Sequence, residues 1–508
     1  MSQSATLTWF ARHEFRLAWR DWLWMMTAGK RGRERVVAAV LAIFAGVMHL
    51  FAYSMVAGFA SIGVHPQKPA LVAVTGSVLL AFSLMLSQAM EQVTRAFYAR
   101  SDLELILSSP VAARRVFAVR IAALAVSTTL LGLVLAAPFI DVLAYLGGAR
   151  WLAAYGVVTA TGLIASSLAV ALTVALFRAI GPKRTRVVAQ IVAAVIGAAF
   201  IIGLQVAAIL SYGTLSRFAA LRSATLLRHA PALDSLLWWP ARAALGDWTA
   251  LAAVLGASLL MLGLVVTVFS ARFGDHVIAA TSVAQSRVRQ RAGRDFRAGS
   301  PMRALRQKEW TLLMRDPWLL SQTLMQLLYL LPPALLLWKS FNHGGGALVL
   351  LVPVLVMAAG QLAGGLSWLA ISGEDAPDLV ATAPVPARMI VYAKIEAVMT
   401  AVALVFAPLL LPLAFTARWF ALCAGLGIVA AAASASAVQL WFRRQAKRSQ
   451  FRRRQVSSRM ATFAEAFSSI TWAGTAALAA AASPLALFTA LIALMVLAGT
   501  WALAPRTA

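Results

Sequence analysis

Residues 101–121 read SDLELILSSPVAARRVFAVRI and lie between two apolar runs, each long enough to cross a membrane. A related stretch, DAPDLVATAPVPARMIVYAKI, covers residues 375–395 and lies between two further apolar runs. Both stretches place acidic residues first, a proline in the middle and basic residues after it. A chain that keeps two such polar segments between membrane-length runs is expected to use them at the membrane surface.

The composition predicts a polytopic membrane protein. Of 508 residues, 61% are hydrophobic and only 12% are charged, whereas a soluble domain is about half apolar and a quarter charged. The 45 basic and 18 acidic residues give a net charge of +27. The cations cluster between apolar runs, which indicates a role in topology and contact with anionic membrane lipid, and no binding of nucleic acid. With one cysteine, Cys423, the chain has no intrachain disulfide and no cysteine zinc site.

About twelve apolar runs reach the length of roughly 20 residues that a spanning helix needs. They cover residues 36–62, 70–97, 118–147, 151–178, 187–211, 247–271, 318–339, 346–371, 389–415, 418–441, 461–481 and 484–504. Twelve spans place the most basic connections on one side, which is expected to be cytoplasmic. The exception is the segment 211–248, which is basic but falls on the other side. Its apolar residues recur at helical spacing, so it is either an amphipathic helix on the outer surface or an ordinary long loop.

The two halves of the chain repeat one another. Aligning Pro110 with Pro384 sets an offset of 274 residues, and the offset holds as far as Pro138 and Pro412. Further aligned pairs are Ser101 with Asp375, Glu104 with Asp378, Arg114 with Arg388, and Arg120 with Lys394. After a gap of six residues, Ala149-Arg150-Trp151 aligns with Ala417-Arg418-Trp419 at an offset of 268.

The entries to the two halves match as well, because HEFRLAWRDWLW from His13 aligns with KEWTLLMRDPWLL from Lys308. The matched polar residues are Glu14, Arg20 and Asp21 in the first half and Glu309, Arg315 and Asp316 in the second. We therefore expect an all-α membrane protein with two parallel repeats, each an entry helix followed by six spans. The expected divisions are residues 1–272 for the first half, 273–300 for a basic cytoplasmic linker and 301–508 for the second half.

Each repeated loop is predicted to form a short capped helix. Ser101 and Glu104 have the spacing of a capping box, and Asp375 caps the second copy with Asp378 in its first turn. Pro110 and Pro384 end the two helices. The next helix begins near Arg114 or Arg388 and leads directly into a span. Such a stiff, exposed element suits the docking of a soluble partner, although a plain turn without a partner remains the alternative.

The pattern Asp-Leu-Glu-Leu-(x)3-Ser-Pro-Val-(x)2-Arg-Arg from Asp102, after an entry segment with Arg20-Asp21, resembles permease subunits of bacterial ABC exporters of the type-2 permease family. The resemblance implies coupling helices that dock into two copies of a separate ATP-binding subunit, with ATP-Mg bound there. It also implies the bacterial inner membrane, with both termini cytoplasmic. The residues that it places in ATPase docking are Ser101, Asp102, Glu104, Pro110, Arg114, Asp375, Asp378, Pro384 and Arg388. The resemblance implies an amphipathic outer-face element between the fifth and sixth spans of each half. The second half departs from this pattern, since it has only a short link near Ser483 at that place.

No catalytic, cofactor or metal site is expected on the chain. The phosphate-binding pattern G-x-x-x-x-G-K-[ST] does not occur, and the Gly29-Lys30 pair lacks the upstream glycine. Two other functions stay open: an ion-coupled secondary transporter and a non-transporting membrane scaffold. The acids that a carrier would use are Glu91, Asp141, Glu396 and Glu465, but each lies near a predicted span end, where contact with water explains it. The pair Gly360 and Gly364 suits helix packing under every hypothesis, and the transported substrate cannot be read from the sequence.

Overall fold

The computed structural model describes residues 34–60, 67–98, 113–212, 224–284, 300–315, 346–372, 377–442 and 459–504, and seven single residues: Arg12, His13, Arg16, Arg20, Leu324, Leu328 and Leu335. Throughout these residues the regular structure is helical, and no strand occurs. The chain divides into two compact units. Unit 1 contains the described residues up to 284, and unit 2 contains those from 300 onward.

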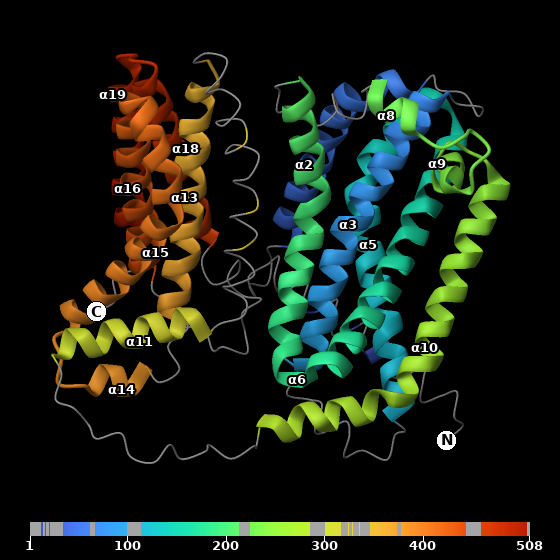
Figure 1. Ribbon diagram of the computed structural model, residues 1–508, viewed down its shortest axis with the longest axis horizontal. Coiled ribbons are helices and arrows are strands. Elements are labelled where there is room, and N and C mark those ends of the chain that lie inside the picture. The colour runs from blue at the N-terminus through green and yellow to red at the C-terminus, as the bar shows by residue number, and fades with distance from the viewer. Residues whose placement is uncertain are drawn as a thin grey trace. The chain divides into compact units, whose positions relative to one another are not determined.

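Unit 1 is built from long apolar helices. They are α2 (Glu34–Val56), α3 (Lys68–Tyr98), α5 (Ala113–Gly147), α6 (Ala153–Tyr212) and α10 (Trp248–Ala284), with the 3-10 helices η1 (Ala57–Phe59) and η2 (Ala149–Leu152). The helix α6 has two arms, 153–180 and 182–212, which form a hairpin in Figure 1. The reversal occurs at Gly181, whose φ of 75° is left-handed and therefore favours glycine.

The core of unit 1 forms where α3, α5 and α10 pack against α6. Met90 of α3, Phe117 of α5 and Val174 of α6 are almost completely buried in it. By contrast, α2 packs mainly against α5 and exposes large apolar side chains such as Phe44 and Leu50. An exposed apolar helix flank is what a lipid-facing surface requires.

The segment after α6 folds as several short helices over residues 224–247. They are α8 (Ala224–His229), η3 (Leu236–Trp238) and α9 (Trp239–Ala244), and residues 213–223 lie outside the described part. Trp238, Ala241 and Leu245 form a core cluster with Leu71 and Trp151. Over the described residues the segment is thus neither one long amphipathic helix nor an unpacked loop, because it packs on the ends of α3, α6 and α10.

Unit 2 has a tightly packed centre of three helices. Its elements are α11 (Pro301–Arg315), α13 (Gly346–Ser372), α14 (Pro377–Thr382), α15 (Ala387–Thr416), α16 (Arg418–Trp441), α18 (Arg459–Ala480) and α19 (Leu485–Leu503). Among them α13, α16 and α18 pack against one another, with α15 and α19 at the flanks. Figure 1 shows α11 lying across the ends of α13 and α15, with the short α14 beside it.

Small residues allow the three central helices of unit 2 to approach closely. A Cβ atom on Gly360 would lie 2.4 Å from the Ser469 hydroxyl oxygen, and one on Gly364 would lie 1.8 Å from Oε1 of Glu465. The pair Gly360 and Gly364 therefore forms the contact face of α13 toward α18.

Ten described helical segments are long and apolar enough to cross a membrane, which makes the chain a multi-pass membrane protein. Six belong to unit 1 and four to unit 2. Of the twelve predicted runs, 318–339 lies outside the described residues except for three of its leucines. The run 461–481 forms α18, whose Arg459, Glu465 and several hydroxyl side chains make it less apolar than the ten.

Candidate functional site

The candidate site lies at the end of unit 2 where α11, α14 and the start of α15 come together (Figure 1). The sequence starts α11 at a defined point. Pro301 occupies the first turn, where no backbone donor is needed, and Oγ of Ser300 accepts a hydrogen bond from the Arg303 N–H at 3.3 Å. This cap fixes the first turn of the helix that crosses the unit.

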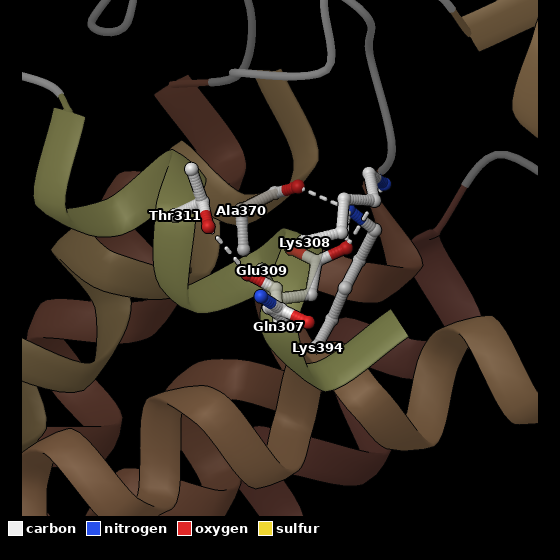
Figure 2. A network of polar contacts seen from close by, with 6 residues as sticks. All are labelled: Gln307, Lys308, Glu309, Thr311, Ala370 and Lys394. Carbon is white, nitrogen blue, oxygen red and sulfur yellow. Dashed lines mark hydrogen bonds and ion pairs between the residues drawn. The ribbon is translucent and has the colours of Figure 1, made fainter. Parts of the chain in front are cut away.

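A buried ion-pair network attaches α11 to α15 (Figure 2). The Glu309 side chain is fully buried, and its Oε1 lies 3.0 Å from Nζ of Lys394 and 3.1 Å from Nζ of Lys308. Lys394 also donates to the Ala370 carbonyl at the end of α13. One carboxylate thus connects α11 to α15, and through Lys394 the connection reaches α13.

A second ion pair and an apolar contact support this attachment. Nε of Arg306 donates to Oε2 of Glu396 at 2.8 Å, and both side chains are about half exposed. One turn beyond Glu309, Leu313 is buried in the core of unit 2. Because charged and apolar contacts act on the same helix, α11 and the first turns of α15 are expected to move together. We call this assembly the α11–α15 elbow.

Prolines shape the connection between α13 and α15. The short helix α14 begins at Pro377 and ends at Thr382, and Pro384 lies in the bend that follows. Pro386 caps α15 with φ −57° and ψ 132°, an extended geometry that redirects the chain into the spanning helix. Leu379 in α14 is 72% exposed, so this short helix presents an apolar side chain outward.

A shallow groove of about 580 Å³ lies beside the elbow. Its lining residues are Met302, Pro386, Arg388, Met389, Tyr392, Ile395 and Glu396. The walls come from α11 and from the first turns of α15. The groove therefore combines an apolar lining with one exposed cation, Arg388.

The residues predicted for ATPase docking and for the entry helices are described only in part. Arg114 is exposed in the first turn of α5, Pro384 and Arg388 are exposed beside α14, and Arg20 is an exposed helical residue. For Asp378 and Arg315 the structure describes the helical backbone alone. The predictions on Ser101, Asp102, Glu104, Pro110, Asp375, Glu14, Asp21 and Asp316 lie outside the described residues.

The sequence reasoning did not predict the partner of Glu309. Lys394 was recognised only as the counterpart of Arg120 in the repeat. The two cations are both well enclosed, since Arg120 is 5% exposed and the Lys394 side chain is 12% exposed. A basic residue kept inside an apolar run, seven residues after the start of α15, was the signal that could have indicated a buried acid nearby.

Three of the acids near predicted span ends have polar partners, and the expectation of contact with water is wrong for one of them, Glu465, because its side chain is buried. Glu396 pairs with Arg306, and Asp141 bonds to Tyr155 and His49. Glu465 is 8% exposed, and its Oε2 accepts a hydrogen bond from Nε2 of Gln439 at 2.6 Å. Apolar runs locate the helices but do not reveal which polar side chains meet between them.

In the described part of the chain, no three His, Cys, Asp or Glu side chains lie close enough together to hold a metal ion. Comparisons of the chain with protein-family models, with curated proteins and with solved structures give no match.

Proposed function

We propose that this chain is the permease subunit of an ATP-driven ABC exporter, with two fused halves that form the translocation pathway. Two copies of a separate ATP-binding subunit would hold ATP-Mg and dock at the ends of the repeated loops. The chain itself would carry no catalytic site. In this proposal it lies in the bacterial inner membrane, with both termini in the cytoplasm.

The observation that carries the proposal is the α11–α15 elbow. A soluble motor can move spanning helices only if its docking element is exposed and stiffly joined to them. Leu379, Pro384 and Arg388 are exposed, and α15 leads from this point directly into a span. The buried Glu309–Lys394 pair makes the junction stiff. Force applied at α14 would therefore reach α13 and α15 together.

The order of helix contacts supports the two parallel repeats of the proposal. In unit 1, α5 contacts both α3 and α6, and these two contact each other. In unit 2, α15 contacts both α13 and α16, which also contact each other. Pro138 and Pro412, which align at an offset of 274, lie inside the corresponding helices α5 and α15. This correspondence favours twelve spans in two sets of six.

The test is purification of the tagged full chain in mild detergent from cells that contain its natural partners. We expect an ATP-binding subunit to co-elute, and the double variant Glu104→Lys plus Asp378→Lys to lose it. Arg388→Glu is expected to weaken co-elution as well. Arg418→Glu is the matched control, because Arg418 is also exposed at the first turn of a spanning helix but at the opposite end of unit 2. Equal loss in both arginine variants, or no ATP-binding subunit with the wild type, would reject the proposal.

An ion-coupled carrier is the second candidate, and the buried Glu465 favours it. Acids enclosed by helices in a membrane often bind the coupling ion. A carrier would transport its substrate in proteoliposomes that contain this chain alone, driven by an ion gradient and without ATP. Such uptake, abolished by Glu465→Gln, would decide for the carrier and against the exporter.

A further inference from the structure

Three polar side chains from three helices meet on the flank of unit 1. Nε2 of His49 in α2 lies 3.3 Å from Oδ2 of Asp141 in α5. The hydroxyl of Tyr155 in α6 donates to Oδ1 of the same carboxylate at 2.6 Å. The His49 and Asp141 side chains are 40% and 47% exposed. All three residues lie in membrane-spanning segments.

The backbone decides which nitrogen of His49 carries a hydrogen. Nδ1 lies 2.7 Å from the carbonyl oxygen of Ala45, one turn earlier in α2. A carbonyl oxygen can only accept, so Nδ1 must donate. In a neutral imidazole with its hydrogen on Nδ1, the other nitrogen, Nε2, is an acceptor.

Nε2 would then face a second acceptor. The carboxylate of Asp141 already accepts from Tyr155 through Oδ1, and an ionised Oδ2 has no hydrogen to give. A neutral His49 beside an ionised Asp141 would thus bring two lone pairs together at 3.3 Å. One additional proton removes the conflict, either on Nε2 as an imidazolium or on Oδ2 as a carboxylic acid.

We propose that His49 and Asp141 form a proton-binding site that fastens α2 to α5 and α6. With its proton the pair has no net charge, which suits a membrane-spanning position, and without the proton it has a charge of −1. The proton donates across the Nε2–Oδ2 contact and joins the helices. Its loss leaves two acceptors facing each other, so α2 loosens from α5 as the pH rises.

The surroundings of α2 make this contact important. Apart from Ala52, the described side chains of α2 are at least partly exposed, so apolar packing fixes the helix weakly. One further polar attachment comes from η2, where Arg150 donates to the Ala60 carbonyl just after η1 at 3.3 Å. The other titratable or charged side chains of this region, Tyr53 on α2 and Tyr145 on α5, are exposed, and η1 carries none.

The second half of the chain lacks this site, if the proposed repeat is taken as a guide. The offset of 274 places Phe415 opposite Asp141, and the offset of 268 places Cys423 opposite Tyr155. Phe415 is exposed and Cys423 is buried, so the second half has an aromatic ring and a thiol at these places. The fold does not require polar groups here, which favours a dedicated role for the cluster in unit 1.

The direct test reads the protonation state of the full chain in lipid bilayers. Histidines are labelled with nitrogen-15, and the signal of His49 is identified by its absence in the spectrum of His49→Gln. We expect either an imidazolium at His49, or a neutral His49 with hydrogen on Nδ1 together with a protonated Asp141 in the infrared spectrum. Either signature is expected to disappear as the pH rises. A neutral His49 beside an ionised Asp141 throughout the pH range would overturn the proposal.

A second experiment measures the attachment of α2 itself. Spin labels on cysteines at Val47 and Leu135, both exposed, report the distance between α2 and α5 in a Cys423→Ala background. The wild-type distance is expected to lengthen as the pH rises. In Asp141→Asn the amide can donate to Nε2 and accept from Tyr155 without an extra proton, so the distance should stay short at every pH. A wild-type distance that does not change with pH, or an Asp141→Asn distance that changes as the wild type does, would contradict the proposal.

Tyr155→Phe is the control for this experiment. It removes the hydroxyl bond to Asp141 but leaves the proton between His49 and Asp141, so the distance should still respond to pH. Loss of the response in Tyr155→Phe alone would assign the effect to the tyrosine and overturn the assignment to His49. None of these readouts involves ATP or a partner subunit, so they can fail while the proposed function stands, and the reverse also holds.

Discussion

At the scale of single residues, Glu309 is the most sensitive position of the elbow, because its buried carboxylate depends on lysine partners. Lys394→Met removes one partner while Glu309 stays enclosed. Removing one member of a buried ion pair costs on the order of 3 kcal/mol. We expect a clear fall in the thermal unfolding midpoint of the full chain in detergent.

Arg306→Met provides the matched control. It breaks the pair with Glu396, whose two side chains are about half exposed, and exposed pairs contribute less than about 1 kcal/mol. The same thermal measurement should therefore show a much smaller change. If both variants lose the same stability, burial is not what makes the Glu309 network important.

Gly364 offers a second test at this scale. A Cβ added there would lie 1.8 Å from Oε1 of Glu465, so Gly364→Ala must displace a buried side chain. Overpacking of this kind costs about 1 to 3 kcal/mol. Gly474→Ala in α18 meets no atom within 4 Å and should be neutral or stabilising, since alanine favours a helix over glycine by about 1 kcal/mol. A thermal unfolding midpoint for Gly364→Ala as high as that for Gly474→Ala would contradict this account.

At the scale of elements, the start of α10 depends on one side-chain cap. The Asp247 carboxylate accepts from the Thr249 hydroxyl at 2.6 Å and from the N–H groups of Thr249 and Ala250 at 3.0 and 3.1 Å. These bonds, chiefly that from the Thr249 hydroxyl, lower the pKa of Asp247 below its ordinary value. Loss of the cap in Asp247→Ala is expected to cost about 1 kcal/mol at neutral pH.

The sign of the pH dependence follows from the lowered pKa. The stabilisation by ionised Asp247 is complete above its unfolded pKa of about 3.9. It is lost as the pH falls through the lower pKa of the folded state. The difference in unfolding midpoint between the wild type and Asp247→Asn should thus be constant near neutrality and shrink in acid. A difference that grows in acid would show that the ionised cap is not the cause.

The helices themselves were largely predictable from the sequence. Long apolar runs located ten described spans, because a helix in lipid must be apolar along its length. The prediction of a short helix that is ended by Pro384 also agrees with the structure, in which α14 ends at Thr382. The small folded segment with Trp238 and Ala241 was not predicted, since its short helices are held by contacts with distant helices and not by their own periodicity.

The polar contacts of the candidate site could not be predicted in the same way. Glu309 was singled out by the repeat, but its pairing with Lys394 depends on α11 crossing the end of α15. Likewise Asp141 was noticed as an acid in an apolar run, whereas His49, 92 residues away, was not connected to it. One sequence gives the positions of polar residues along each helix, and only the packing of helices determines which of them meet.

At the scale of the whole molecule, the number of spans can be tested by labelling from either side of the membrane. Arg184, next to the Gly181 turn, and Thr382, in α14, are both exposed. Three described spans separate them, and the predicted span 318–339 would be the fourth. With twelve spans, single cysteines at these two positions, in a Cys423→Ala background, should react from the same side.

Leu237 provides the control position, since it is exposed at the other end of unit 1 and one described span separates it from Arg184. A cysteine there should react from the side opposite to Arg184. If cysteines at Arg184 and Thr382 react from opposite sides, residues 318–339 do not cross the membrane. The hypothesis of two parallel halves would then be rejected.

The close contact of α13, α16 and α18 has a consequence for permeation. A Cβ on Gly427 would lie 2.7 Å from a Val356 methyl group. A buried hydrogen bond joins Ser367 to Ser436, and a partly buried one joins Trp472 to Ser434. An interior packed this densely has low compressibility and yields little to a passing molecule. The three helices are therefore expected to move as one rigid unit. In the proposed permease, solute would pass along the outer surface of this unit instead of through its axis.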